Sequence, residues 1–267
     1  MLRKGDLTQG GITGTLLHFT LPMMVGSFLQ QCYNIADTLI VGQCIGAGAL
    51  AAVGSAYTLM VFLISVLLGL AMGSGTVFSL HYGAGNHVAL RRSIFSSFVL
   101  IGIVTLILNV AVFIWLDPIL RLLQVPQDIY GMMRSYSWII FCGIVFTFIY
   151  NFYASLLRAV GDSVTPLWFL AVSVVLNIAL DLFFILQLDW GIQGAAAATV
   201  LAQGVAALGI IIYTYRRRPE LRWHHEDMCF DRTCLKEIAS FSTLTCVQQS
   251  VMNLGILMIQ GLVNSFG

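Results

Sequence analysis

Seven long apolar stretches dominate the sequence, and short segments rich in Gly, Pro, Asn and charged residues separate them. A helix needs about 20 mostly apolar residues to cross the hydrocarbon core of a bilayer. Irregular backbone cannot face lipid, so each stretch is predicted to be a transmembrane helix. The stretches do not alternate apolar with polar residues, as the strands of a membrane barrel do. Their approximate limits are Leu16–Val41, Leu50–Val77, Ile94–Leu116, Ser137–Leu157, Leu167–Leu188, Ala195–Tyr215 and Ile238–Val263.

The composition supports a membrane protein. Of the 267 residues, 58% are hydrophobic and only 9% are charged, whereas about a quarter of the residues in soluble domains are charged. A soluble globule of this size would need far more charge on its surface, so lipid is expected to cover much of the exterior. The predicted fold is an all-α integral membrane protein: a six-helix transmembrane bundle followed by the first helix of a second repeat.

Lysine and arginine predict the orientation of the helices. If the N-terminus and every second loop lie in the cytoplasm, all but two of the 13 Lys and Arg residues fall on the cytoplasmic side, and only Arg121 and Arg134 lie outside. Such a bias is the rule for helical membrane proteins. We therefore expect a multi-pass protein of the cell membrane with a cytoplasmic N-terminus.

The most charged loop divides the chain into two predicted units. Residues 1–222 form the six-helix lobe, and residues 223–267 comprise a cytoplasmic loop and the first helix of an incomplete second lobe. The segment from Phe241 to Gly267 weakly resembles the segment from Phe19 to Gly46, because both open with Phe and hydroxyl residues and carry Gln in mid-helix. Transporters are often built from repeated bundles. The chain is therefore expected to be a fragment of a longer protein.

Only two of the 12 acidic residues, Asp37 and Asp181, fall inside predicted helices. A charged side chain in a lipid-facing helix costs roughly 2.5–3.5 kcal/mol, so such residues usually face a cavity or a partner. Both have polar neighbours three or four residues away, which lie on the same helix face. These neighbours predict a hydrated pocket shared by the first, fifth and sixth helices. They are Gln30, Tyr33 and Asn34 near Asp37, Asn177 near Asp181, and Thr199 with Gln203 on the sixth helix.

Two kinds of chemistry suit this pocket, and the residue types alone do not choose between them. Burial disfavours the charged form of a carboxyl, and a second carboxyl nearby disfavours it further, so the pair could bind and release a proton. Alternatively, Na⁺ could bind to oxygens of Asp37, Asn177 and Asp181. The plain alternative is a structural polar contact between helices, or an Asp37 side chain wetted near the outer surface.

Several other classes of site are not supported by the sequence. Neither lysine lies in a phosphate-binding GxxxxGK[ST] loop, and HExxH, GxSxG and CxxC are absent, so no enzyme or ATPase is predicted. No basic run interleaved with aromatic residues suggests nucleic acid. The cytoplasmic loop holds a cluster of His224, His225, Cys229 and Cys234, but the spacing differs from that of tight zinc sites.

Taken in order, the motifs resemble those of the multidrug and toxic compound extrusion (MATE) transporters. The stretches LPMMVGSFLQQCYNIADTLIVGQCIGAGALAAVG, SLHYGAGN, LRAVGDSVTP and NIALD are similar to the opening helix, two cytoplasmic loops and a polar helix site of the family's N-terminal half. The resemblance implies a twelve-helix protein in two lobes, in which Asp37, Tyr33, Asn177, Asp181 and Thr199 form the cation or proton site. It further implies that the first helix bends at Pro22.

The function implied by this resemblance is export of lipophilic organic cations by antiport against H⁺ or Na⁺, with alternating access and no other cofactor. The expected partners are the lipid bilayer, cationic drugs in a cavity with Gln30, Asn34 and Gln203, and a second lobe. A lipid-linked oligosaccharide flippase of the same superfamily is the nearest alternative, but it would be expected to place arginines in its cavity. A membrane enzyme would need a reactive cluster, and a structural protein would not need acids buried on separate helices.

Overall fold

The computed structural model describes residues 12–122, 125–222 and 232–265, and these ranges contain helices and no strands. Each predicted apolar stretch is helical, and most helices extend past the predicted limits. The elements in chain order are α1 (Ile12–Cys44), α2 (Ala47–Gly83), α3 (His87–Leu122), α4 (Gln127–Cys142), α5 (Ile144–Ala159), α6 (Val164–Leu182) with the π-helical turn η1 (Phe183–Gln187), α7 (Gly191–Arg217), the short 3-10 turn η2 (Pro219–Leu221) and α8 (Arg232–Ser265).

Length and composition allow up to five membrane spans among the described helices. Four are α2, α3, α6 with η1, and α7, and the fifth is the bent pair of α4 and α5. The helices α1 and α8 are long but are not among these five, and α1 carries the polar positions around Asp37. That α1 and α8 also span the membrane therefore stays a prediction.

The fourth predicted span, Ser137–Leu157, differs from a single helix. It breaks at Gly143, where α4 and α5 meet at an angle of 46°. A Cβ atom on Gly143 would lie only 2.5 Å from Cγ2 of Val200 on α7. The break therefore brings the α4–α5 backbone against α7 more closely than any side chain at position 143 would allow.

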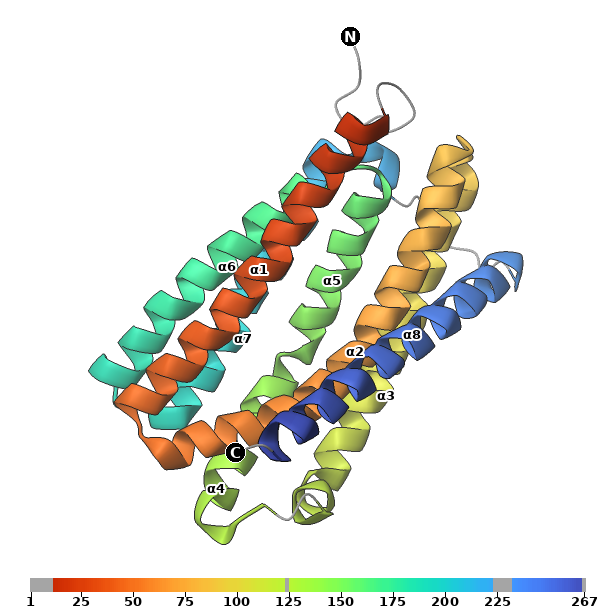
Figure 1. The fold of residues 1–267 in the computed structure, drawn as a ribbon. Coiled ribbons are helices and arrows are strands. Elements are labelled where there is room, and N and C mark those ends of the chain that lie inside the picture. Colours follow the sequence, from red (N-terminus) through yellow and green to blue (C-terminus); the bar gives the residue numbers. More distant parts are fainter. Residues whose placement is uncertain (1–11, 123–124, 223–231, 266–267) are drawn as a thin grey trace.

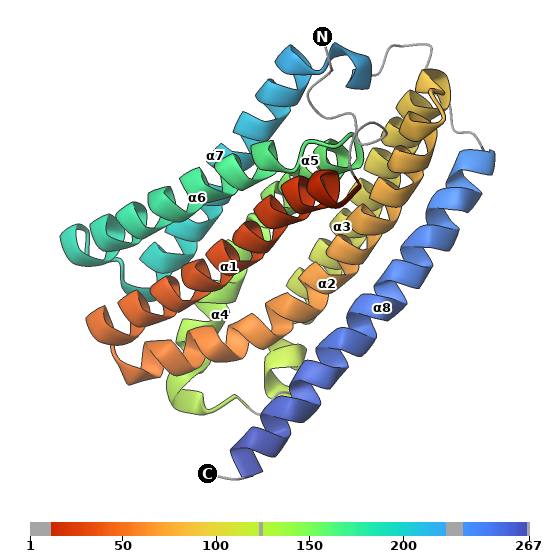
Figure 2. The same cartoon turned by 45° about the horizontal axis from the view of Figure 1, so that its top comes forward.

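The bundle is organised around α2 and α7. The helix α2 packs against α3, α4, α5 and α8, whereas α7 packs against α4, α5 and α6. The helix α1 lies on α6 and, to a lesser extent, on α2, so it sits at one side of the bundle (Figures 1 and 2). It continues without interruption through Pro22, and a bend at this proline stays a prediction.

Large apolar side chains cover much of the outside of the bundle, as expected for helices that contact lipid or a second lobe. They occur on α1, α3, α6 and α7 alike. Examples are Phe28, Leu106, Ile114, Trp168, Val175 and Leu208, each at least 58% exposed. The cluster that includes His224, His225 and Cys229 lies outside the described residues.

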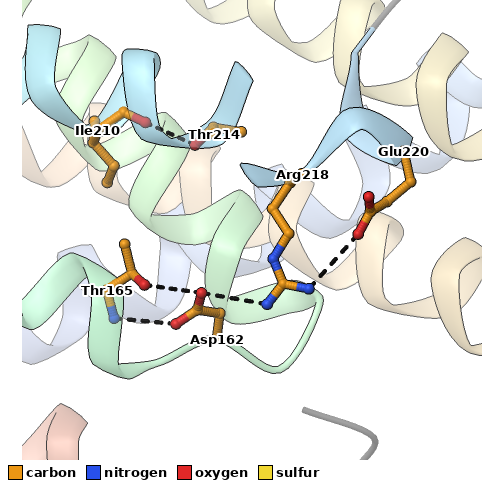
Figure 3. A network of polar contacts seen from close by, with 6 residues as sticks. All are labelled: Asp162, Thr165, Ile210, Thr214, Arg218 and Glu220. Atoms are coloured by element: carbon orange, nitrogen blue, oxygen red, sulfur yellow. Dashed lines mark hydrogen bonds and ion pairs between the residues drawn. The ribbon is translucent and has the colours of Figure 1, made fainter. Parts of the chain in front are cut away.

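A polar network fixes the end of α7 to the loop between α5 and α6 (Figure 3). Just before α6, Asp162 accepts hydrogen bonds from the backbone nitrogen and the hydroxyl of Thr165, at 3.1 and 2.9 Å. Arg218 then reaches Oδ2 of Asp162 at 3.4 Å and Oε1 of Glu220 at 3.6 Å. The loop can turn here because Gly161 adopts a φ of +87°, which is costly for other residues. This end of the lobe is therefore held in one arrangement.

Candidate functional site

Three neighbouring helices present the polar residues of the candidate site. The helix α1 carries Tyr33 and Asp37, which are four residues apart and so share one face. The helix α6 carries Asn177 and Asp181 with the same spacing, and α7 carries Thr199. Because α6 packs against both α1 and α7, the three polar faces meet in the interior of the bundle. We call these five residues the carboxyl cluster.

The Thr199 hydroxyl joins the three helices. Its Oγ1 accepts a hydrogen bond from Tyr33 Oη at 3.3 Å and another from Asn177 Nδ2 at 3.4 Å. Both distances are longer than typical hydrogen bonds of these kinds, so both bonds are weak. Weak hydrogen bonds to Thr199 therefore join the three helices at the carboxyl cluster.

The two carboxyl groups lie together and are shielded from solvent. Asp181 and Asn177 have no exposed surface, and Asp37 is 8% exposed. The carboxyl groups of Asp37 and Asp181 lie close enough for each to feel the charge of the other. Among the described residues, no lysine or arginine forms an ion pair with either of them. Two buried acids thus face each other without a compensating positive side chain.

Several oxygens of the carboxyl cluster lack a donor. Within the described part of the chain, no protein group donates a hydrogen bond to Oδ1 of Asp37, Oδ1 of Asn177 or either carboxyl oxygen of Asp181. An unsatisfied buried polar group typically costs about 1–3 kcal/mol, and more when it is charged. An arrangement this costly suits a site that a proton or a cation completes, because either one satisfies these oxygens.

Tyr136 belongs to the same neighbourhood, although the sequence did not single it out. It lies on α4, is 4% exposed, and is electrostatically coupled to Asp37, Tyr33 and Asp181. The predicted fourth span began at Ser137, one residue later. The available signal was a tyrosine between two serines, two residues after Arg134, at the start of an apolar stretch.

A small pocket adjoins the carboxyl cluster. Thr199 contributes to both, and Gln203, one turn further along α7, accepts a hydrogen bond from the Thr147 hydroxyl on α5. The pocket has room for about one water molecule. Its lining is mostly apolar and comes from α2, α4, α5 and α7: Met60, Ile64, Ile140, Phe141, Ile144, Thr147, Thr199, Val200 and Gln203.

The structure does not place Gln30 and Asn34 in this pocket. Gln30 is exposed, and Asn34 is half-buried and donates a hydrogen bond to Oε1 of Gln31 at 3.5 Å. Successive residues of an α-helix are about 100° apart around its axis. Gln30 and Asn34 therefore lie beside the face of α1 that carries Tyr33 and Asp37. The polar stripe of α1 thus divides into a buried part and a part on the surface of the lobe.

A helical membrane bundle with an uncompensated pair of buried acids is typical of membrane transport proteins, because such acids often lie on the paths of ions and protons. A family model described as MatE matches residues 22–183, more than half of the chain. The chain belongs to this family of transporters.

Relatives and solved structures agree. The chain is 33% identical over 273 residues to the "Probable multidrug resistance protein YpnP" of Bacillus subtilis (strain 168), covering 100% of this chain and 59% of that protein. It is 31% identical over 210 residues to the "Multidrug export protein MepA" of Staphylococcus saprophyticus, covering 76% of this chain and 45% of that protein. A solved "outward-facing conformation of a multidrug resistance MATE family transporter" matches with a TM-score of 0.89 at 25% identity, over 96% of this chain and 57% of that one. The chain thus spans about half the length of these proteins.

Proposed function

We propose that this chain, together with a second lobe, exports lipophilic organic cations by antiport against H⁺ or Na⁺. The observation that carries the proposal is the carboxyl pair of Asp37 and Asp181, which is buried, shared between α1 and α6, and not balanced by a positive side chain. A second argument is that the chain resembles proteins named for multidrug export and resistance.

Electrostatics explains why this pair would respond to a cation. Two ionised carboxylates about 4 Å apart repel by roughly 4 kcal/mol at an effective dielectric constant of 20. One proton bound between them removes a charge and supplies the missing hydrogen bond. A sodium ion would instead bind to oxygens of Asp37, Asp181 and Asn177. Each of these side chains has at least one oxygen that receives no hydrogen bond from the described part of the protein. Either ion draws α1 toward α6.

The movement of α1 would link ion binding to the access of the drug. The helix α1 packs mainly on α6 and lies at the side of the bundle. It contributes Val41 to the main core, so a shift of α1 repacks only the part of the core around this residue. When the ion binds, α1 closes on the carboxyl cluster and one access state is favoured. Lipophilic cations would contact Gln203, Gln30 and Asn34 in a cavity formed together with the second lobe, because the pocket beside Thr199 has room only for about one water molecule. Inward movement of one charge supplies about 2.3 kcal/mol per 100 mV of membrane potential.

The distribution of basic residues supports a cytoplasmic N-terminus. The α2–α3 turn, the α5–α6 loop and the end of α7 lie at the same end of the bundle (Figure 1). This end carries Arg91, Arg92, Arg158 and Arg216 to Arg218, whereas Arg121 and Arg134 lie toward the other end. Positive residues favour the cytoplasmic side.

The proposal is tested by ethidium efflux from cells that produce the full-length protein. We expect Asp37→Asn and Asp181→Asn to abolish efflux at unchanged protein level, because each removes one of the two acids but keeps the shape of the side chain. Asp117→Asn is the matched control, since Asp117 lies on the surface in a pair with Arg134 at 2.7 Å. Efflux by both cluster variants at the wild-type rate would refute the assignment.

The coupling ion is identified in proteoliposomes. Purified full-length protein is exposed either to a pH gradient without sodium or to a sodium gradient at equal pH, and ethidium transport is followed by fluorescence. A proton antiporter responds to the first gradient and a sodium antiporter to the second. Transport that needs neither gradient would contradict antiport, even if the Asp variants were inactive.

A further inference from the structure

The helices α6 and α7 lie side by side along one edge of the bundle (Figure 2), and each exposes an apolar face. On each helix the exposed apolar residues recur every three or four positions, which places them on one face. They are Val164, Trp168, Val172 and Val175 on α6, and Leu201, Val205, Leu208 and Ile212 on α7. Because both helices are long and apolar enough to cross a membrane, acyl chains are the expected neighbours of these faces.

The apolar face of α7 ends at an arginine. Arg216 follows Ile212 by four residues, so it lies on the same face, one turn nearer the end of the helix, and its side chain is exposed. Arg217 is also exposed, but it is turned by about 100° around the helix axis and so leaves this face. Arg216 is therefore the basic residue placed where the apolar face of α7 meets the membrane surface.

The start of α6 brings a tryptophan to the same level. The rings of Phe169 on α6 and Tyr213 on α7 meet edge to face, with centroids 6.1 Å apart. A Cβ atom on Gly209 would lie 2.6 Å from Cε1 of Phe169, so the two helices approach closely at this level. Trp168, the neighbour of Phe169, is 68% exposed. Tryptophan is enriched at the depth where hydrocarbon meets the lipid headgroups.

The charge of Arg216 is not used within the described part of the chain. Asp162 and Glu220 both bind Arg218, at 3.4 and 3.6 Å, so the acidic side chains of this network already have a cation (Figure 3). Neither Arg216 nor Arg217 forms an ion pair with a described residue. An exposed cation above two apolar helix faces is complementary to an amphipathic anion.

We infer that the junction of α6 and α7 binds one anionic phospholipid of the cytoplasmic leaflet. Arg216 pairs with the phosphate, Trp168 lies against the glycerol region, and the acyl chains cover the apolar faces of both helices. A guanidinium group forms strong charged hydrogen bonds to phosphate, and the cytoplasmic leaflet is rich in anionic lipids. We call Arg216 and Trp168, with the two apolar faces, the lipid site. The inference uses the orientation given under the proposed function, but lipid binding here needs no transport activity.

The test measures contact between Trp168 and lipid in phosphatidylcholine nanodiscs that hold the purified full-length protein. Each disc contains a small fraction of brominated lipid, and bromine near the headgroup end of the acyl chain quenches tryptophan on contact. The signal of Trp168 is the difference between proteins with and without Trp168→Phe. We expect phosphatidylglycerol to quench this signal at about one fifth of the fraction that phosphatidylcholine needs, because one arginine near the membrane surface favours an anionic lipid about fivefold.

Two single substitutions of equal charge change separate a local site from the general attraction of a basic surface. Arg216→Gln should make the two brominated lipids equally effective. Arg217→Gln is the matched control, since it removes the same charge one position away and should keep the fivefold preference. Native mass spectrometry gives a readout that does not depend on Trp168: the wild-type protein should retain one phosphatidylglycerol that Arg216→Gln loses.

Four results would overturn the lipid site. They are a preference that survives Arg216→Gln, an equal loss in Arg217→Gln, abolition of the preference by excess inorganic phosphate, which would indicate a site for free anions, and no quenching of Trp168 by either lipid, which would indicate that a second copy of the chain covers this face. Ethidium transport is measured on the same preparation. A protein that keeps the lipid preference but transports no ethidium would count against the proposed function alone.

Discussion

Replacement of Gly143 by alanine should destabilise the protein through a single collision. Gly143 lies at the break between α4 and α5, with φ −85° and ψ −6°, values that alanine also adopts, so no backbone strain is expected. The new methyl group would lie 2.5 Å from Cγ2 and 2.9 Å from Cγ1 of Val200. Carbon atoms in favourable contact are about 3.5–4.0 Å apart, so the overlap is about 1 Å.

The magnitude follows from the stiffness of Val200. A valine in a helix has one strongly preferred χ1 rotamer, so its methyl groups cannot turn away. Overpacking of this kind costs about 1–3 kcal/mol. Alanine in place of glycine lowers the conformational entropy of the unfolded chain, which stabilises the folded protein by about 0.4–1 kcal/mol. The net loss expected for Gly143→Ala is therefore about 0–2.6 kcal/mol, centred near 1.3 kcal/mol.

The assay is thermal unfolding of purified full-length protein in one detergent, followed by tryptophan fluorescence. Val200→Ala removes the methyl groups that collide, so the double variant should recover about 1–2 kcal/mol relative to the sum of the single changes. Gly204→Ala is the control, because a Cβ atom there lies 3.7 Å from Phe146, an ordinary contact. Additive effects of Gly143→Ala and Val200→Ala, or a more stable Gly143→Ala protein, would refute the reasoning.

Three further predictions concern other contacts. Ser155→Ala removes the hydrogen bond from the Ser155 hydroxyl to the carbonyl of Ala71 at 2.8 Å and should lower the free energy of unfolding by about 1 kcal/mol, measured in the same unfolding assay. Arg218→Met leaves Asp162 without its cation, and the arginine side chain is 20% exposed. The free energy of unfolding should therefore fall by about 1 kcal/mol or less in the same assay. An unchanged melting temperature would show that the network does not stabilise the junction of α7 with the α5–α6 loop. Tyr136→Phe should reduce ethidium efflux at unchanged melting temperature, because it keeps the buried ring and removes only the phenolic hydroxyl beside the carboxyl cluster.

The helices and the carboxyl cluster could be predicted from the sequence for physical reasons. Lipid imposes long apolar stretches, and those stretches located α1, α2, α3, α6, α7 and α8, whereas α4 and α5 were predicted as one helix. A buried acid in such a stretch is costly, which singled out Asp37 and Asp181, and helix periodicity added Tyr33 and Asn177. The structure brings these four residues together with Thr199. Their role in ion coupling stays a prediction.

The break at Gly143 and the place of Tyr136 could not be predicted in this way. The break depends on the approach of Val200, which is 57 positions later and has no signature near residue 143. Tyr136 comes near the carboxyl cluster through the packing of α4 against α7, a contact between helices far apart in the sequence. Gln30 and Asn34 share the polar stripe of α1, but the sequence did not tell which part of the stripe is buried. Each of these features is set by tertiary contacts.

The same break explains how an ion and a drug could influence each other. On one side of Gly143, α4 brings Tyr136 to the carboxyl cluster, and on the other side α5 brings Thr147 to Gln203. Thr199 and Gln203 are one turn apart on α7, so a shift of α7 that tightens the carboxyl cluster also changes the pocket. Coupling between two sites is reciprocal: the factor by which the ion changes the affinity for the drug equals the factor by which the drug changes the affinity for the ion. In the proposed mechanism the ion therefore need not touch the drug to expel it, because Thr199 at the carboxyl cluster and Gln203 at the pocket are one turn apart on α7.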